Sequence, residues 1–78
     1  MKEALTKADT YMANRTSGQY IYARAHVQSC LSSINKSDFL MAYHWLDKAM
    51  SEAERISDTD LFEMLDRLEP AIDKMEAF

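Results

Sequence analysis

The sequence predicts an all-α fold, a small bundle of four amphipathic helices that forms a single domain over residues 1–78. Apolar side chains recur at intervals of three and four residues along almost the whole chain, which is the period of a helix with one buried face. The chain holds one glycine and one proline, too few for a turn-rich β-fold. Hydrophobic residues make up 47% and charged residues 28%, a balance typical of a folded domain rather than of a disordered chain.

The first helix is predicted over residues 2–14. Its polar side chains, such as Lys7 and Asp9, fall opposite an apolar arc about 120° wide at 100° per residue. The segment from Asn14 to Gly18 then interrupts the pattern, so we expect a loop there. The predicted apolar arc comprises Met1, Ala4, Leu5, Ala8, Tyr11 and Met12.

The second helix is predicted over residues 17–35. Thr16 and Gln19 have the spacing of a capping box, in which each side chain bonds to a free backbone N–H at the start of a helix. Asparagine tolerates the left-handed backbone conformation that often ends a helix, so we place the end at Asn35 and Lys36. The residues expected to be buried are Tyr20, Ala23, Val27, Cys30, Leu31 and Ile34.

The third helix is predicted over residues 38–56, with Ser37 or Asp38 as its N-cap. It has the most regular apolar stripe in the chain. The stripe comprises Phe39, Ala42, Tyr43, Leu46, Ala49, Met50, Ala53 and Ile56.

The fourth helix is predicted over residues 59–77. The acidic and hydroxyl side chains of residues 57–60 indicate its start, because they can accept free N–H groups and they complement the positive end of the helix dipole. Pro70 removes one backbone hydrogen bond, yet the apolar phase continues past it, which predicts a helix kinked at Pro70. A break with a new start at Glu69 is the alternative. The apolar side comprises Leu61, Met64, Leu65, Leu68, Ala71, Ile72, Met75 and Phe78.

Cysteine content and hydropathy place the chain among cytoplasmic proteins. One cysteine cannot form an internal disulfide, which argues against a small secreted scaffold. No apolar run approaches the roughly 18 residues of a membrane span. The first nine residues lack the apolar core of a signal peptide. We therefore expect a cytoplasmic protein without a membrane partner.

The net charge is −4, and the charged residues are distributed unevenly along the chain. Residues 1–37 carry five basic and two acidic side chains, whereas residues 38–78 carry eleven acidic and four basic ones. A general nucleic-acid binder needs a clustered basic stripe to displace phosphate counterions, so this distribution disfavours direct nucleic-acid binding. Two interpretations remain open: the two halves attract each other within the fold, or an acidic surface meets a partner protein with a basic surface.

Few residue combinations point to catalysis or to metal binding. His26 and Cys30 lie four residues apart, so both side chains reach one side of a helix, but two ligands do not complete a zinc site. His44 and Asp47 are three residues apart on the expected exposed face, without an assignable nucleophile or oxyanion donor. We therefore expect that the protein is not an enzyme and that it needs no cofactor and no metal ion.

Several large apolar residues fall outside the stripes that a bundle would bury, and one helix carries a row of acids. Either the apolar residues cover the ends of the bundle, or they form exposed patches of the kind that anchor protein interfaces. On the second interpretation, Ile21, Tyr22 and Phe62 gather at one end, with Leu40, Met41 and Trp45 toward the other. The predicted partner-binding residues are Ile21, Tyr22, Met41, Trp45, Phe62, Asp66, Glu69, Asp73 and Glu76.

The stretch from Leu5 to Met12 resembles the opening of the Hha/YmoA family of small four-helix proteins, and Tyr43, Asp47 and Glu52 continue the match without gaps. Members of that family bind a nucleoid-structuring protein and modulate gene silencing. The second helix and the C-terminal segment of the family are not reproduced here. The resemblance implies a nucleoid-associated factor that modulates gene silencing.

Two functions are consistent with these features. The first is a non-catalytic protein-binding module, a small regulator or inhibitor that occupies the surface of a partner protein, as accessory proteins of phages and mobile elements often do. The second is a homodimeric nucleoid-associated protein in which the surplus apolar residues form the dimer interface. The first is the main prediction, because the chain offers contact surface and acidic side chains but no reactive centre.

Overall fold

Helices account for nearly all of the chain that the computed structural model describes, which is residues 2–15 and 18–77. Within these ranges the predicted all-α fold is confirmed. None of the helices in the described part of the chain combines the length and the apolar character needed to cross a membrane. The elements are α1 (Lys2–Ala13), the 3-10 turn η1 (Gly18–Tyr20), α2 (Ile21–Asn35), α3 (Phe39–Arg55), α4 (Thr59–Asp66) and α5 (Leu68–Glu76).

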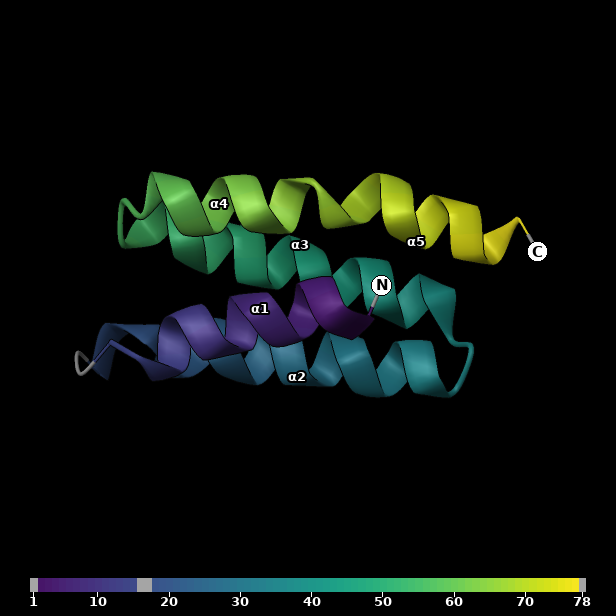
Figure 1. The fold of residues 1–78 in the computed structure, drawn as a ribbon, viewed down its shortest axis with the longest axis horizontal. Helices are drawn as coiled ribbons and strands as arrows, with labels where there is room; N and C mark the ends of the chain where they lie inside the picture. Colours follow the sequence, from purple (N-terminus) through teal and green to yellow (C-terminus); the bar gives the residue numbers. More distant parts are fainter. Residues whose placement is uncertain (1, 16–17, 78) are drawn as a thin grey trace.

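The helices form an elongated bundle of 37 × 19 × 18 Å (Figure 1). α1, α2 and α3 run in alternating directions, and α4 and α5 together run opposite to α3. α2 packs along α3, and α4 and α5 return along the other side of α3. α1 lies against both α2 and α4, which closes the ring of helices. Because α2 and α4 both follow turns at the same end, their first residues lie at that end, and the start of α3 lies at the other.

The core follows the predicted stripes, and small residues set how closely the helices approach. Along α3 the buried positions Ala42, Ala49 and Ala53 have no exposed surface, so neighbouring backbones pack close to this helix. Predicted residues at the edges of the stripes, among them Leu31 and Met50, are partly buried. The buried apolar residues are Leu5, Ala8, Met12, Tyr20, Ala23, Val27, Cys30, Ile34, Ala42, Leu46, Ala49, Ala53, Leu61, Leu65, Leu68 and Ile72.

The second helix ends where predicted, at Asn35 with Lys36 as its C-cap, but its start and the left-handed residue after it differ from the prediction. Residues 16 and 17 lie outside the described residues, so the predicted capping box on Thr16 and the start at residue 17 do too. The described segment begins with η1 and becomes α-helical at Ile21. At the other end the left-handed residue is Ser37, with φ of 59°, rather than Asn35, which is the last residue of α2. The following Asp38 is the N-cap of α3 and accepts a hydrogen bond from the N–H of Met41 (3.3 Å).

The predicted last helix is interrupted at Arg67, three residues before the kink expected at Pro70. The alternative, a break with a new start at Glu69, lies closer to the structure, because α5 begins at Leu68. Arg67 separates α4 from α5 but keeps right-handed helical angles (φ −68°, ψ −15°), so the two helices continue in one direction (Figure 1). Pro70 is the third residue of α5 and lies four residues after Asp66. Because proline has no backbone N–H, it cannot donate a hydrogen bond to the Asp66 carbonyl, and in a regular helix its ring would clash with that carbonyl. The interruption therefore falls before the proline, because the ring displaces the preceding turn.

Candidate protein-binding surface

A shallow hollow of about 290 Å³ lies where α3 faces the start of α5. Leu40, Tyr43 and Asp47 are spaced by three and four residues, so they form one row along α3 beside its buried stripe. Glu69 closes the hollow from α5. We call this surface the α3–α5 groove; its lining residues are Leu40, Tyr43, His44, Leu46, Asp47, Met50 and Glu69.

Apolar groups form much of the α3–α5 groove, and one of them is almost fully exposed. Leu40 has 81% of its surface in contact with solvent, the highest value among the large exposed apolar residues of the described chain. Leu46 is buried beneath the groove, and Met50 is partly buried beside it. Covering Leu40 with a partner would remove its apolar surface from water, which contributes about 1.5–3 kcal/mol for a side chain of this size.

The four predicted acidic residues are all exposed and lie on α4 and α5. Their spacings of three, four and three residues place them on one side of this helical segment. The Tyr43 hydroxyl of α3 donates a hydrogen bond to Asp73, which ties the acidic side to the groove. The four residues are Asp66, Glu69, Asp73 and Glu76.

Several of these acids act on Tyr43 at the edge of the groove. The hydrogen bond to Asp73 raises the pKa of Tyr43 to about 12, with smaller contributions from burial and from the negative charges of Asp73, Glu76 and Glu69. A negative field that disfavours a second anion favours a cation at the same place. The α3–α5 groove therefore combines exposed apolar surface with an electrostatic preference for basic groups.

The predicted apolar contact residues are distributed over several surfaces rather than one. Ile21 and Tyr22 are exposed by 66% and 63% at the start of α2, and Met41 is exposed by 38% at the opposite end, near the start of α3. Phe62 is partly buried and lines a hollow of about 290 Å³ at the turn between α3 and α4. Ile21 instead borders a smaller hollow of about 100 Å³ beside the end of α1. Phe62 and Ile21 thus share an end of the bundle but line different hollows there.

Trp45 packs between two histidines and is partly buried. Its ring stacks on His26 of α2 with 5.6 Å between centroids and 20° between planes. His44 meets the same ring edge-on at 5.1 Å and 71°. Trp45 therefore joins α2 to α3, and part of its predicted contact surface is used inside the bundle.

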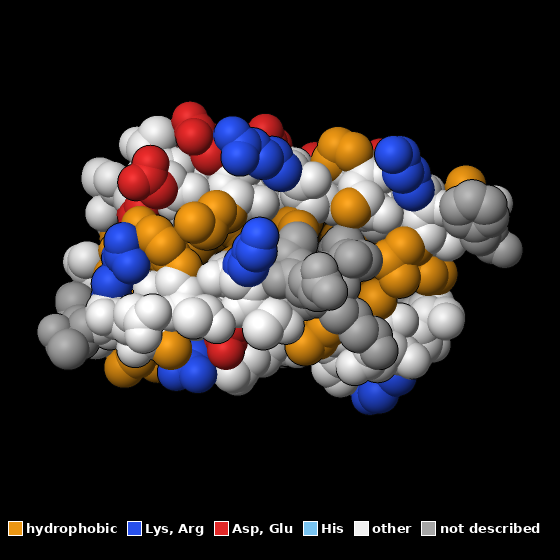
Figure 2. Space-filling view, viewed as in Figure 1, with side chains coloured by type: hydrophobic (Ala, Val, Ile, Leu, Met, Phe, Trp, Pro, Cys, Tyr) orange, Lys and Arg blue, Asp and Glu red, His pale blue; other side chains and the backbone are white. Residues whose placement is uncertain are grey.

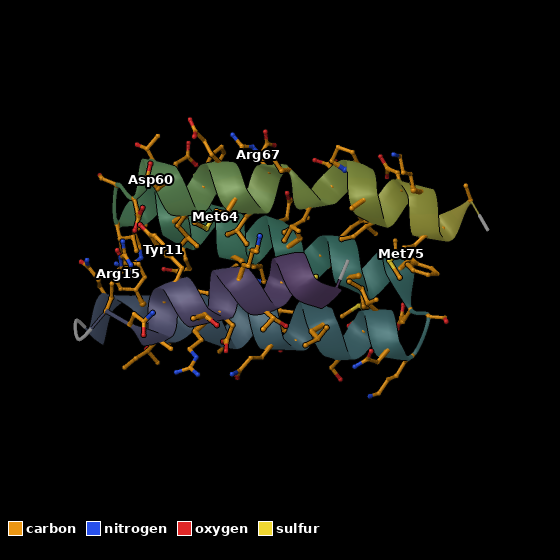
Figure 3. All side chains as sticks on the ribbon, viewed as in Figure 1. Tyr11, Arg15, Asp60, Met64, Arg67 and Met75 are labelled. Carbon is orange, nitrogen blue, oxygen red and sulfur yellow. The ribbon has the colours of Figure 1, made fainter. Side chains whose placement is uncertain are left out.

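A partly buried carboxylate, that of Asp58, organises the end of the bundle where α1 finishes. Tyr11 donates to both carboxylate oxygens of Asp58 (2.9 and 3.0 Å), and Tyr20 donates to the same group. The Arg15 guanidinium lies 3.3 Å from the centre of the Tyr11 ring and 4.0 Å from Asp58, and Figure 3 shows Tyr11 and Arg15 together at this end. The Asp58 side chain also accepts from the N–H of Leu61 and is 11% exposed.

This Asp58 cluster ties α1 and η1 to the start of α4. Burial opposes ionisation of Asp58, but the hydrogen bonds from Tyr20, Leu61 and Tyr11, together with Arg15, outweigh it and lower the pKa of Asp58. The carboxylate is thus held ionised by groups of the protein itself. We assign the cluster to the stability of the fold, because its hydrogen bonds connect three elements of the bundle.

The pairs considered for metal binding or acid–base chemistry are separated or exposed. Cys30 is fully buried, and burial raises the pKa of its thiol to about 11, whereas His26 stacks on Trp45. His44 and Asp47 are exposed on α3 and both line the α3–α5 groove. Over residues 2–15 and 18–77, no three histidine, cysteine or acidic side chains converge in a way that could hold a metal ion.

The residues of the α3–α5 groove were only partly foreseen from the sequence. Glu69 and Asp73 are predicted contact residues, and Leu40 is one of the apolar residues outside the stripes. Tyr43 is assigned by its periodicity to the core and is in fact partly buried at the edge of the groove. In the sequence, the spacing of Leu40, Tyr43 and Asp47 is what could have identified Tyr43 as a groove residue, because this row runs beside the buried stripe rather than opposite to it.

No family model, no curated protein and no solved structure matches the chain. A functional proposal therefore starts from the geometry of the chain's own residues.

Proposed function

We propose that the chain is a non-catalytic protein-binding module, a small regulator or inhibitor that occupies a basic, amphipathic surface of a partner protein. The observation that carries this proposal is the α3–α5 groove, where the 81% exposed Leu40 lies beside a hollow closed by Glu69. Exposed apolar surface supplies contact energy, and nearby acids supply steering and selection of the partner. Neither feature contributes to the core of the bundle.

A basic partner fits this surface for an electrostatic reason. Asp47 and Glu69 border the groove, while Asp73 and Glu76 extend the negative side along α5. A lysine or arginine that approaches Leu40 finds acids on both helices, whereas an acidic partner meets like charges. The side of the molecule in Figure 2 differs, because Lys and Arg side chains there lie over α1 and among the acids of α4 and α5.

The test uses the chain as bait, with and without nuclease, against lysate of its source, followed by affinity measurements with the purified partner. Glu69→Lys reverses a charge in the groove, and Leu40→Ser removes its exposed apolar group. Glu63→Lys makes the same charge change at an exposed position of α4 that does not line the groove. We expect each groove variant to weaken binding about tenfold or more, and Glu63→Lys to leave the affinity within about twofold.

Other outcomes contradict the proposal. A partner that binds both groove variants as tightly as the parent chain does not use this surface. A partner whose affinity is insensitive to salt is not held by the acids, because screening weakens contacts between exposed charges. Proteins that are lost after nuclease treatment favour the nucleoid-associated alternative instead.

A further inference from the structure

The outward side of α2 is a second surface, separate from the α3–α5 groove. It lies opposite the buried stripe of the helix, within an arc of about 100° at 100° per residue. Ile21, Tyr22, Ala25 and Ser32 are exposed there, and Ser29 is partly exposed. Hydrophobic side chains are visible along the lower left edge of Figure 2, over the start of α2. We call these five residues the α2 face.

The α2 face is uncharged along the whole helix, which is unusual for the solvent side of an amphipathic helix. The charged residue within α2 is Arg24, and its Nε lies 2.8 Å from Asp9 of α1, so it points along the side of α2 that meets α1. Lys36 follows the last residue of α2 and ends the row. The outward positions of α3 differ, because they include Lys48 and Arg55.

This absence of charge indicates what covers the α2 face. A charged partner gains little there, since the five residues carry no charge and Arg24, which shares a hollow with Ile21, is already paired with Asp9. A second copy of the chain presents the same neutral face, so two copies can meet without apposing like charges, although each carries a net charge of −4. Contact through the acidic side of α4 and α5 would instead place like charges together.

Side-chain size gives the arrangement of the two copies. We infer that two chains associate through their α2 faces as antiparallel helices related by a two-fold axis near Ala25. In that register Ile21 of each copy lies over Ser29 of the other, because the axis pairs positions equally far from Ala25. Ile21 then fills the space above Ser29, and the small Ala25 at the axis lets the two helices approach closely.

Sedimentation equilibrium of the full-length chain tests the inference without any partner. We expect the apparent mass to rise with concentration toward twice the 9.0 kDa of one chain. Ile21→Glu places a charge in the α2 face and is expected to raise the dimer dissociation constant about tenfold or more. Ser51→Glu is the matched control, because it adds the same charge at an exposed position of α3 that lines neither the α3–α5 groove nor the α2 face. It is expected to leave the dissociation constant unchanged.

Two results would overturn the inference. One is a mass that stays at that of a single chain up to about millimolar concentration, the range of very weak association. The other is dimerisation that Leu40→Glu abolishes and Ile21→Glu does not, which would place the interface in the groove. Circular dichroism of each variant confirms that it is folded, and Ala25→Arg gives a second disruption at the centre of the face. The sedimentation experiment contains no partner protein, so a failure to dimerise would leave the proposed binding of a partner through the α3–α5 groove unaffected.

Discussion

Ser37 and Ser57 occupy the same position in two successive helix–helix turns, and both have a backbone φ of 59°. In each turn the serine N–H donates to the carbonyl three residues earlier, and the next N–H donates to the carbonyl five residues earlier. The residue that follows each serine, Asp38 or Asp58, is the N-cap of the next helix. The chain thus uses one turn twice: a left-handed serine and then a capping aspartate.

Replacing either serine by glycine is expected to stabilise the protein. A side chain at positive φ costs about 1–2 kcal/mol, and glycine avoids most of this cost while losing more chain entropy. We expect Ser37→Gly and Ser57→Gly each to raise the free energy of unfolding by about 0.5–1 kcal/mol in urea titrations. Ser51→Gly, at an exposed position inside α3, is the control and should lower it by a similar amount. Destabilisation by both turn variants would contradict the assigned backbone strain.

The two capping aspartates are expected to differ strongly in their contribution to stability. Asp38 is exposed and caps α3, whereas Asp58 caps α4 and also accepts hydrogen bonds from Tyr11 and Tyr20. Asp38→Ala removes a cap and should cost about 0.5–1 kcal/mol. Asp58→Ala leaves two tyrosine hydroxyls without their acceptor and should cost about 2–4 kcal/mol. Equal losses in urea titrations would show that the Asp58 cluster adds nothing to the cap.

The contribution of Asp58 also depends on pH. Its pKa is lower in the folded protein than the ordinary value of 3.8, so ionised Asp58 stabilises the fold. This stabilisation is complete above that ordinary value and is lost as the pH falls through the lower folded pKa. The difference in unfolding free energy between the parent chain and Asp58→Asn should therefore shrink in acid below about pH 4. A constant difference between neutral and acid pH would contradict this assignment.

The helices were predictable because each buries one side of a regular period, but two local features were not. The end of α2 at Asn35 and Lys36 was predicted, but the left-handed backbone conformation was assigned to Asn35, because asparagine tolerates it. The turn instead uses Ser37, since Asp38 directly after it must already cap α3. The interruption at Arg67 precedes Pro70 because the steric effect of a proline ring reaches back one turn.

The composition of the α3–α5 groove depends on information that helical periodicity does not contain. Periodicity gives the row of Leu40 and Tyr43 on α3 and the row of Glu69 and Asp73 on α5. It does not give the handedness of the bundle, which decides whether those rows face each other or lie on opposite sides. The position of Trp45 shows the same limit, since its contact with a histidine of α2 follows from how two helices pack.

Cys30 is expected to be inert to thiol reagents in the folded protein. It is fully buried and is the only cysteine of the chain, and burial raises its pKa to about 11, so little thiolate forms near neutral pH. An aromatic disulfide reagent should therefore react slowly under native conditions, at a rate limited by opening of the bundle, and completely in denaturant. Fast native labelling would show that the α2 core opens readily. Cys30→Ala should remove all labelling and serves as the blank.

Tyr43 is expected to resist ionisation because of the acids across the groove. Its hydrogen bond to Asp73 raises its pKa to about 12, aided by burial and by the charges of Asp73, Glu76 and Glu69. Tyrosinate absorbance of the parent chain minus that of Tyr43→Phe isolates this group. Asp73→Asn removes the largest cause and should bring the midpoint back toward the ordinary value near 10. Glu63→Gln, which removes an acid outside this set, should leave the midpoint unchanged.

The raised pKa of Tyr43 also gives the sign of its effect on stability. A group whose pKa is higher in the folded protein than in the unfolded chain stabilises the fold. This stabilisation is complete at pH values below the pKa of the unfolded chain, and it is lost as the pH rises through the pKa of the folded protein. The protonated Tyr43 should therefore hold α3 to α5 up to about pH 10, and the advantage over Tyr43→Phe should disappear by about pH 12. Helix content during alkaline titration of both proteins measures this. If Tyr43 titrated near 10 in the parent chain, the acids would not act on the groove, and the electrostatic basis for a basic partner would be lost.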